Sequence, residues 1–238
     1  MYSIKLLTHL CVYAIIICIQ NTKRDVAMIY SPKFKVGFLH CMKCGGTSIK
    51  VYLERQDDSF HRPHGRVVLR NYHEPLSRKI QVPTFNLEEN KIITLIRNPY
   101  DLLPSFWRFW RRLHNLNNEY RRRNRQSFAA NNREFGEFVE WFRDEMKHKN
   151  GGSALSFWDY FNIDGKIPDN LTIVKMEDMD QFPVKLKELG VPIDDSITIP
   201  VVNKTPEDKY QNWKHTDKTK ELIREMFKWT FDQGFYDE

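Results

Sequence analysis

The residues best suited to chemistry in this chain lie in one run, Lys35–Ser48 (KVGFLHCMKCGGTS). Its first half is apolar and predicts a short buried strand. Two glycines follow, Gly45 and Gly46, which permit a positive φ and let backbone N–H groups approach a ligand closely. The hydroxyls of Thr47 and Ser48 come next and are expected to cap the positive end of a helix. The run therefore predicts a cradle for an anion such as a phosphate.

The order of residues within this loop distinguishes it from the common nucleotide loop. In the P-loop G-x-x-x-x-G-K-[ST] the lysine follows the glycines, whereas Lys43 precedes them here, in K-C-G-G-T-S. ATP is therefore not the expected ligand. On this loop alone a simpler interpretation stays open, in which the Gly-Gly-Thr-Ser turn only joins a strand to a capped helix.

A second strand followed by a helix carries an arginine and a serine. Residues 92–96 form a continuous apolar strand candidate, Arg97 follows at its carboxyl end, and Pro99 suits the first helical position. Ser105 lies eight positions after Arg97, about two helical turns on, so both side chains are expected to reach one anion. Pro104 is expected to distort this helix. Taken alone, Arg97 is equally compatible with a surface ion pair, which contributes little.

Both motifs resemble those of sulfotransferases that use 3′-phosphoadenosine-5′-phosphosulfate (PAPS), especially the membrane-anchored Golgi branch that modifies carbohydrates. The loop is similar to the H-x-P-K-[TC]-G-[GS]-T-S pattern of that branch, with Met42 where many members have Pro. The run R-N-P-Y-D-x-x-x-S resembles the family's 3′-phosphate motif. The resemblance implies that Arg97 and Ser105 bind the 3′-phosphate, and that the 5′ end is held by Lys43, Cys44, Gly45, Gly46, Thr47 and Ser48.

For the reaction, the resemblance implies in-line displacement of the 5′-phosphate by an acceptor hydroxyl. Lys43 is the cation expected to stabilise charge on the bridging oxygen, and the scheme requires no metal. A base must take the hydroxyl proton, and branches of the family differ in using His or Glu. His73 is the first choice, because in several branches the catalytic His lies at a comparable distance ahead of the 3′-phosphate Arg. The other candidates in this region are His64, His61, Glu54 and Glu74.

Arginines and aromatic residues alternate in the segment that follows the second motif. The net charge of the chain is a modest +6, yet seven arginines gather here: Arg108, Arg111, Arg112, Arg121, Arg122, Arg123 and Arg125. We expect an acidic glycan such as a glycosaminoglycan to bind there, with Arg111, Arg112, Arg122 and Arg123 as its contacts. A nucleic acid is the less expected polyanion, and a solvated basic helix face stays an open alternative.

Length and strand spacing indicate one catalytic domain of the α/β class. The chain has 238 residues, 41% of them hydrophobic, which supplies a core of the required size. Apolar strand candidates near Val36, Val67, Ile92 and Leu171 alternate with helical stretches, which predicts a mostly parallel sheet. The resemblance implies a P-loop-like three-layer sandwich, with ligands at the carboxyl ends of the strands. A helix from about Asp217 to near Gly234 is expected to pack its apolar stripe on the sheet.

The N-terminal region carries an apolar segment, residues 6–19, that fits a short signal anchor or the core of a signal peptide. We expect a cytosolic tail and anchor over 1–24, a stem over 25–34 and the catalytic domain over 35–238. The expected location is the Golgi membrane, as a single-pass type II protein with a lumenal catalytic domain. Secretion after cleavage of the segment is the alternative.

Sequons and cysteines add to this expectation. Asn170 and Asn203 each begin an N-x-T triplet, which favours lumenal exposure. Outside the apolar segment only Cys41 and Cys44 are present, which excludes a disulfide framework. No second Cys/His pair with ligand spacing follows them, so a redox or zinc role is disfavoured.

Two other classes of function remain as alternatives. A kinase-like phosphoryl transferase would need a lysine after the glycines and a carboxylate for a metal. A catalytically inactive, membrane-anchored glycan-binding module would need the arginines but not Lys43, Arg97 and Ser105 in register. The motifs thus favour a sulfotransferase over both.

Overall fold

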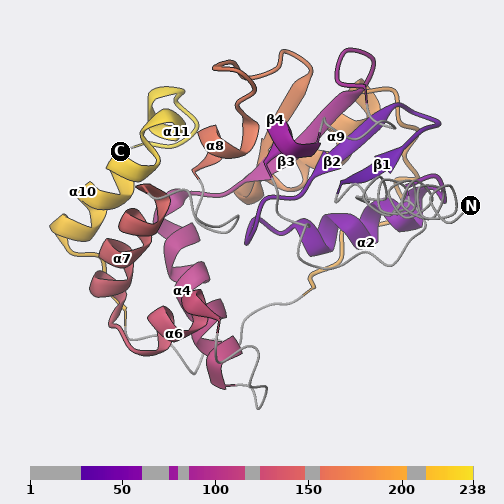
Figure 1. Cartoon of the computed structure of the whole chain (residues 1–238). Coiled ribbons are helices and arrows are strands. Elements are labelled where there is room, and N and C mark those ends of the chain that lie inside the picture. Colours follow the sequence, from indigo (N-terminus) through magenta and orange to yellow (C-terminus); the bar gives the residue numbers. More distant parts are fainter. Residues whose placement is uncertain are drawn as a thin grey trace, which may run out of the picture.

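The structure is a computed structural model, and it describes residues 28–60, 75–79, 86–115, 124–147, 156–202 and 213–237. A four-stranded sheet lies at the centre and is flanked by helices (Figure 1). This arrangement confirms the predicted α/β class with a mostly parallel sheet. The predicted strand near Val67 lies outside the described residues.

The sheet consists of β1 (Ile29–Ser31), β2 (Val36–Leu39), β3 (Lys91–Ile96) and β4 (Leu171–Lys175), in that spatial order. β2, β3 and β4 run parallel, and β1 is antiparallel to β2. β2 is buried throughout and β3 beyond its first residue, as expected for parallel strands that are covered on both faces. β1 lies within residues 25–34, the segment predicted as a stem, so the described sheet begins ahead of Lys35.

The helices that follow these strands fall into two groups. Near the sheet lie α2 (Gly46–Gln56), α3 (Leu76–Lys79), α8 (Phe157–Phe161), the 3₁₀ turn η2 (Met176–Asp178) and α9 (Gln181–Glu188). Beside the sheet, a cluster is formed by α4 (Pro99–Asn115), α6 (Arg125–Asn131), α7 (Phe135–Lys147) and α10 (Asp217–Met226) (Figure 1). The short α11 (Lys228–Asp232) packs on α8. The long helix α4 extends from the end of β3 into this cluster and thereby connects it to the sheet.

Helix α4 continues through Pro104, the residue at which the sequence predicted a distortion. Proline has no N–H, so the carbonyl four residues earlier, that of Tyr100, loses its helical donor. The imidazole Nε2 of His215 lies 2.9 Å from this carbonyl oxygen and takes the place of the missing donor. His215 immediately precedes α10, so the proline couples α4 to the C-terminal segment.

The predicted C-terminal helix differs from the structure in two ways. It is divided at Phe227, where φ is −112° and α10 gives way to α11. Its apolar stripe packs on α7 and α4, with α11 on α8, so the prediction of packing on the sheet was wrong. The stripe was identified correctly, since Leu222, Ile223 and Phe227 are buried, but an amphipathic pattern does not specify its partner.

Asn170 holds the turn before β4 with its side chain. Its amide Nδ2 donates to the carbonyl oxygens of Leu87 and Asn90, at 2.5 and 2.6 Å. An N-linked glycan replaces one of these two hydrogens, so the sequon at Asn170 is incompatible with both bonds. The second sequon, at Asn203, lies outside the described residues.

The structure contains no helix, within the residues it describes, that is long and apolar enough to cross a bilayer. Residues 6–19, predicted as an anchor, lie outside those residues.

Candidate functional site

The glycine loop joins β2 to α2 and contains two residues with positive φ, Lys43 at 64° and Gly45 at 76°. Gly45 is the N-cap residue of α2, and no side chain caps this end. The prediction that Thr47 and Ser48 cap the helix was therefore wrong, because both lie inside its first turn. Ser48 Oγ instead accepts a hydrogen bond from Val202 N–H at 3.1 Å. The N–H groups of Ser48 and Ile49 donate to the carbonyl oxygen of Gly45, at 2.9 and 3.3 Å. Those of Gly46 and Thr47, the first two residues of α2, have no intrahelical acceptor and are available to an anion.

Close packing on both sides of the loop explains why it has two glycines. A Cβ atom at Gly46 would overlap the imidazole of His40. At Gly45 it would lie 2.6 Å from Cε of Met179, closer than unbonded carbon atoms approach. His40 is buried and stacks on Phe38 of β2. The ring of His40 therefore leaves no room for a Cβ atom at Gly46, and at Gly45 the φ of 76° favours glycine, since the end of the Met179 side chain can move.

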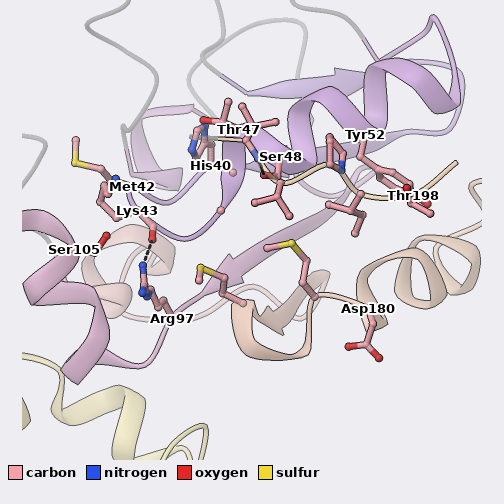
Figure 2. A pocket seen from close by; sticks show the side chains of 18 of the residues that line it. His40, Met42, Lys43, Thr47, Ser48, Tyr52, Arg97, Ser105, Asp180 and Thr198 are labelled. Carbon is pink, nitrogen blue, oxygen red and sulfur yellow. Dashed lines mark hydrogen bonds between the residues drawn. The ribbon is translucent and has the colours of Figure 1, made fainter. Parts of the chain in front are cut away.

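Arg97 leaves the carboxyl end of β3 and points toward the loop (Figure 2). Its Nη1 donates to the carbonyl oxygen of Lys43 at 3.4 Å, while its Nε is buried without a hydrogen-bond partner. A buried, unsatisfied guanidinium N–H is costly, and an anionic ligand would satisfy it. Ser105, 7% exposed, lies on α4 beside this group and lines the same cavity.

Lys43 lies among other cations, with its ammonium 4.4 Å from the centre of the Phe109 ring. Burial, and after it the positive charges of Arg112, Arg97 and Arg108, lower the pKa of Lys43 to about 8. An anion bound at this place would relieve the repulsion among the four side chains and raise the pKa of the lysine again. The electrostatics of the site thus favour a negatively charged ligand.

The cavity at this site has a volume of about 1040 Å³. One wall consists of the glycine loop, Arg97 and the face of α4 that bears Ser105, Arg108 and Arg112. The opposite wall consists of Tyr52 of α2 and the extended residues 197–202 (Figure 2). This volume accommodates a nucleotide and leaves space for a second ligand.

Most of the predicted binding residues are brought together by the fold. Those that line the cavity are Lys43, Gly45, Gly46, Thr47, Ser48, Arg97, Ser105 and Arg112. Cys44 lies beneath the loop, fully buried, and burial raises the pKa of its thiol well above the usual value. Its contribution to binding is therefore limited to its backbone. The roles of these residues stay predictions.

Other predicted residues lie elsewhere. Arg111 is not part of the cavity wall and places its guanidinium 4.7 Å from the ring centre of Trp107. The acceptor contacts Arg122 and Arg123 and the candidate bases His61, His64 and His73 fall outside the described residues.

Sequence reasoning missed Arg108 and His40 as lining residues. Helical spacing was the available signal for Arg108. Residues 105, 108 and 112 share one face of a helix, whereas Arg111 is rotated away from that face. His40 offered no comparable signal, because its place beside Gly46 depends on how the loop folds back.

The chain matches the sulfotransferase domain family over residues 14–186, a span that includes both motifs predicted to bind phosphate. This is well over half of the 238 residues, and the chain belongs to the sulfotransferase domain family. It is accordingly an enzyme of the class that transfers sulfuryl groups. Neither the curated proteins nor the solved structures include a match.

Over the part of the chain that the structure describes, no three His, Cys, Asp or Glu side chains are grouped so as to hold a metal ion. The cavity is lined by the cations Lys43, Arg97, Arg108 and Arg112 and by the glycine loop, and also by the carboxylates of Asp180 and Asp195. The cations and the loop amides fit the phosphate and sulfate groups of PAPS.

Proposed function

We propose that this enzyme transfers the sulfuryl group of PAPS to a hydroxyl of an acidic carbohydrate. The observation that carries the proposal is the convergence of Lys43, Arg97 and Ser105 on one cavity, beside the uncapped start of α2. These side chains come from separate strand-to-helix junctions, yet they meet at the carboxyl ends of neighbouring parallel strands. That is where ligands bind in open α/β sheets.

Each part of this site has a distinct task in the proposed reaction. The first-turn amides of α2 and the ammonium of Lys43 bind the 5′-phosphate, and Lys43 stabilises the charge that develops on the bridging oxygen. Arg97 and Ser105 orient the nucleotide through its 3′-phosphate. PAPS supplies the sulfuryl group: a bond forms between sulfur and the acceptor oxygen, and the bond from sulfur to the bridging oxygen breaks.

The proton of the acceptor hydroxyl goes to a base that we propose among His73, His64 and His61, in that order. An imidazole near its ordinary pKa accepts a proton at neutral or slightly acidic pH.

The positions of Arg108 and Arg112 support the proposal that the acceptor is acidic. Both line the cavity one and two turns beyond Ser105 on α4, and both depress the pKa of Lys43, so their charges lie near the lysine that we propose at the reacting end of the donor. A carboxylate or sulfate next to the acceptor hydroxyl would meet these guanidinium groups. Arg122 and Arg123 are proposed to extend this contact along a glycan chain.

We propose a Golgi lumenal location with residues 1–24 as tail and uncleaved anchor, because the apolar segment 6–19 is short and the thin membranes of the early secretory pathway tolerate short spans. Cleavage and secretion form the alternative. Protease treatment of intact microsomes distinguishes a lumenal from a cytosolic domain, since only a lumenal domain is protected.

The donor is tested by calorimetric titration of the purified full chain with adenosine 3′,5′-bisphosphate, the reaction product, and with ADP, both without magnesium. We expect tight binding of the bisphosphate only, and loss of that preference in Arg97→Ala. The proposed donor is contradicted if the two nucleotides bind with equal affinity, or if neither binds.

The acceptor is tested by following transfer of labelled sulfuryl groups to an unsulfated glycosaminoglycan and to the same polymer with its carboxylates reduced. Arg112→Gln is expected to raise KM for the acidic polymer about tenfold, the effect of one lost charged contact. Arg111→Gln on the same helix is the matched control and should leave KM unchanged. Equal use of the two polymers by the unmodified enzyme contradicts an acidic acceptor.

A further inference from the structure

A carboxylate lies next to the backbone of Arg97 because of the register between β3 and β4. Ile96 pairs with Lys175, so Asn98 and Glu177, each two residues further along, leave the sheet side by side. The N–H of Asn98 donates to Oε1 of Glu177 at 3.0 Å. Arg97 lies between Ile96 and Asn98 at the end of its own strand. Its backbone is therefore held on one side by the strand pairing at Ile96 and on the other by the hydrogen bond of Asn98.

The same carboxylate fixes the start of α4. The side-chain Oδ1 of Asn98 accepts from Tyr100 N–H at 2.9 Å, and its carbonyl oxygen accepts from Leu102 N–H at 2.8 Å. A negative charge is favourable at the N-terminus of a helix. Glu177 thus stabilises both the first turn of α4 and the point where the Arg97 side chain leaves the chain.

The second oxygen of Glu177 is also engaged. The hydroxyl of Tyr236, after α11, donates to Oε2 at 2.6 Å. The ring of Tyr236 is half-buried, and the ammonium of Lys175 lies 5.3 Å from its centre. Burial and the adjacent carboxylate of Glu177 raise the pKa of Tyr236, so its hydroxyl keeps its proton and remains a donor. Tyr236 thereby holds the Glu177 carboxylate in the orientation that faces Asn98.

The turn that carries Glu177 packs on the glycine loop as well. Met176 and Met179, on either side of Glu177, are the side chains nearest to a Cβ built at Gly45. Residues 176–179 therefore contact the proposed 5′-phosphate loop through their methionines and the proposed 3′-phosphate arginine through Asn98. One short segment spans both halves of the donor site.

We propose that Glu177, oriented by Tyr236, is a positioning residue that aligns Arg97 with the 3′-phosphate and so sets the preference for 3′-phosphorylated nucleotides. This inference rests on the proposed donor. Glu177 itself contacts no ligand: it acts through the backbone of Asn98.

The test compares the affinities of the full chain for adenosine 3′,5′-bisphosphate and for AMP, which lacks only the 3′-phosphate. Glu177→Ala is expected to reduce the ratio of the two affinities about tenfold and to leave AMP binding unchanged, since the loss of an aligned charged contact costs about one factor of ten. Tyr236→Phe should reduce the ratio by a smaller factor. Glu177→Gln keeps an oxygen acceptor for Asn98 and should restore most of the preference. Asp178→Ala, one residue on in the same exposed turn, is the matched control.

The outcomes test the proposed donor and the proposed role of Glu177 separately. If the unmodified chain does not prefer the bisphosphate over AMP, the proposed donor is wrong. If it does, and Glu177→Ala keeps the same ratio or loses both affinities by the same factor, the positioning role is wrong and Glu177 only stabilises the fold. If Asp178→Ala lowers the ratio as much as Glu177→Ala, the effect belongs to the turn in general, and the assignment to Glu177 is overturned.

Discussion

The charge state of Lys43 should make donor binding depend on pH in a range where phosphates do not titrate. The pKa of Lys43 is lowered to about 8 by burial and by three neighbouring arginines. Bound phosphates need the ammonium form, so protonation of Lys43 and ligand binding reinforce each other. We therefore expect the affinity for adenosine 3′,5′-bisphosphate to fall as the pH rises through about 8.

The size of the effect follows from this pKa. With a pKa of about 8, roughly nine tenths of Lys43 is protonated at pH 7 and roughly one tenth at pH 9. The second pKa of a phosphate monoester is about 6, so the ligand is fully charged over the whole range. The dissociation constant should accordingly increase about tenfold between pH 7 and pH 9. The bound anion raises the pKa of Lys43 in the complex. Above that higher pKa the complex also loses the proton, and the dissociation constant stops increasing.

Calorimetric titration at several pH values measures this dependence, with Lys43→Arg as the matched variant. An arginine stays charged throughout the range, so the variant should bind with an affinity that does not change with pH, whatever its absolute value. The reasoning is refuted by a flat profile in the unmodified protein, or by an equal decline in Lys43→Arg. The second result would assign the titration to another group.

Three further predictions concern the loop and the turn before β4. Gly46→Ala places a methyl group against the ring of His40 and should destabilise the fold by about 1–3 kcal/mol in urea unfolding. Gly136→Ala, where the added atom meets only an ordinary contact at 3.7 Å, should be neutral or stabilise by up to about 1 kcal/mol; equal losses in both variants would contradict the steric reading of the loop. Asn170→Ala removes two hydrogen bonds and should lower the free energy of unfolding by about 1–3 kcal/mol. Because the Asn170 amide donates both of its hydrogens, we expect it to carry no glycan. The variant Asn203→Gln, which keeps only the Asn170 sequon, should show no mass change on N-glycosidase treatment after production in a secretory system. A mass loss of the size of a glycan would refute this.

The parts of the site that the sequence predicted are those encoded by neighbours along the chain. A strand, a glycine loop and a helix start follow one another directly from Lys35, and the interval from Arg97 to Ser105 needs only the helical repeat. Both motifs therefore indicated where an anion would bind before any tertiary contact was known. The α/β class followed in the same way from the alternation of strand and helix candidates.

The parts that the sequence did not predict depend on contacts between distant segments. The bond between Asn98 and Glu177 follows from the register of β3 and β4, which no local pattern reveals. The rescue of the helix at Pro104 depends on His215, more than a hundred positions further along. Which arginine of α4 faces the cavity depends on how the helix is rotated, and therefore on the packing of the cluster around it.

The parallel pairing of β2 and β3 has a consequence for how this protein acquires its fold. Its glycine loop and Arg97 come from strands separated by a long crossover, and such non-local pairing forms late because the chain entropy must be lost first. A ligand held by both strands binds only the fully paired sheet and stabilises it by mass action, by about 2.7 kcal/mol at a concentration a hundred times its dissociation constant. The supply of donor in the cell would thus affect how much folded enzyme persists, as well as how fast that enzyme works.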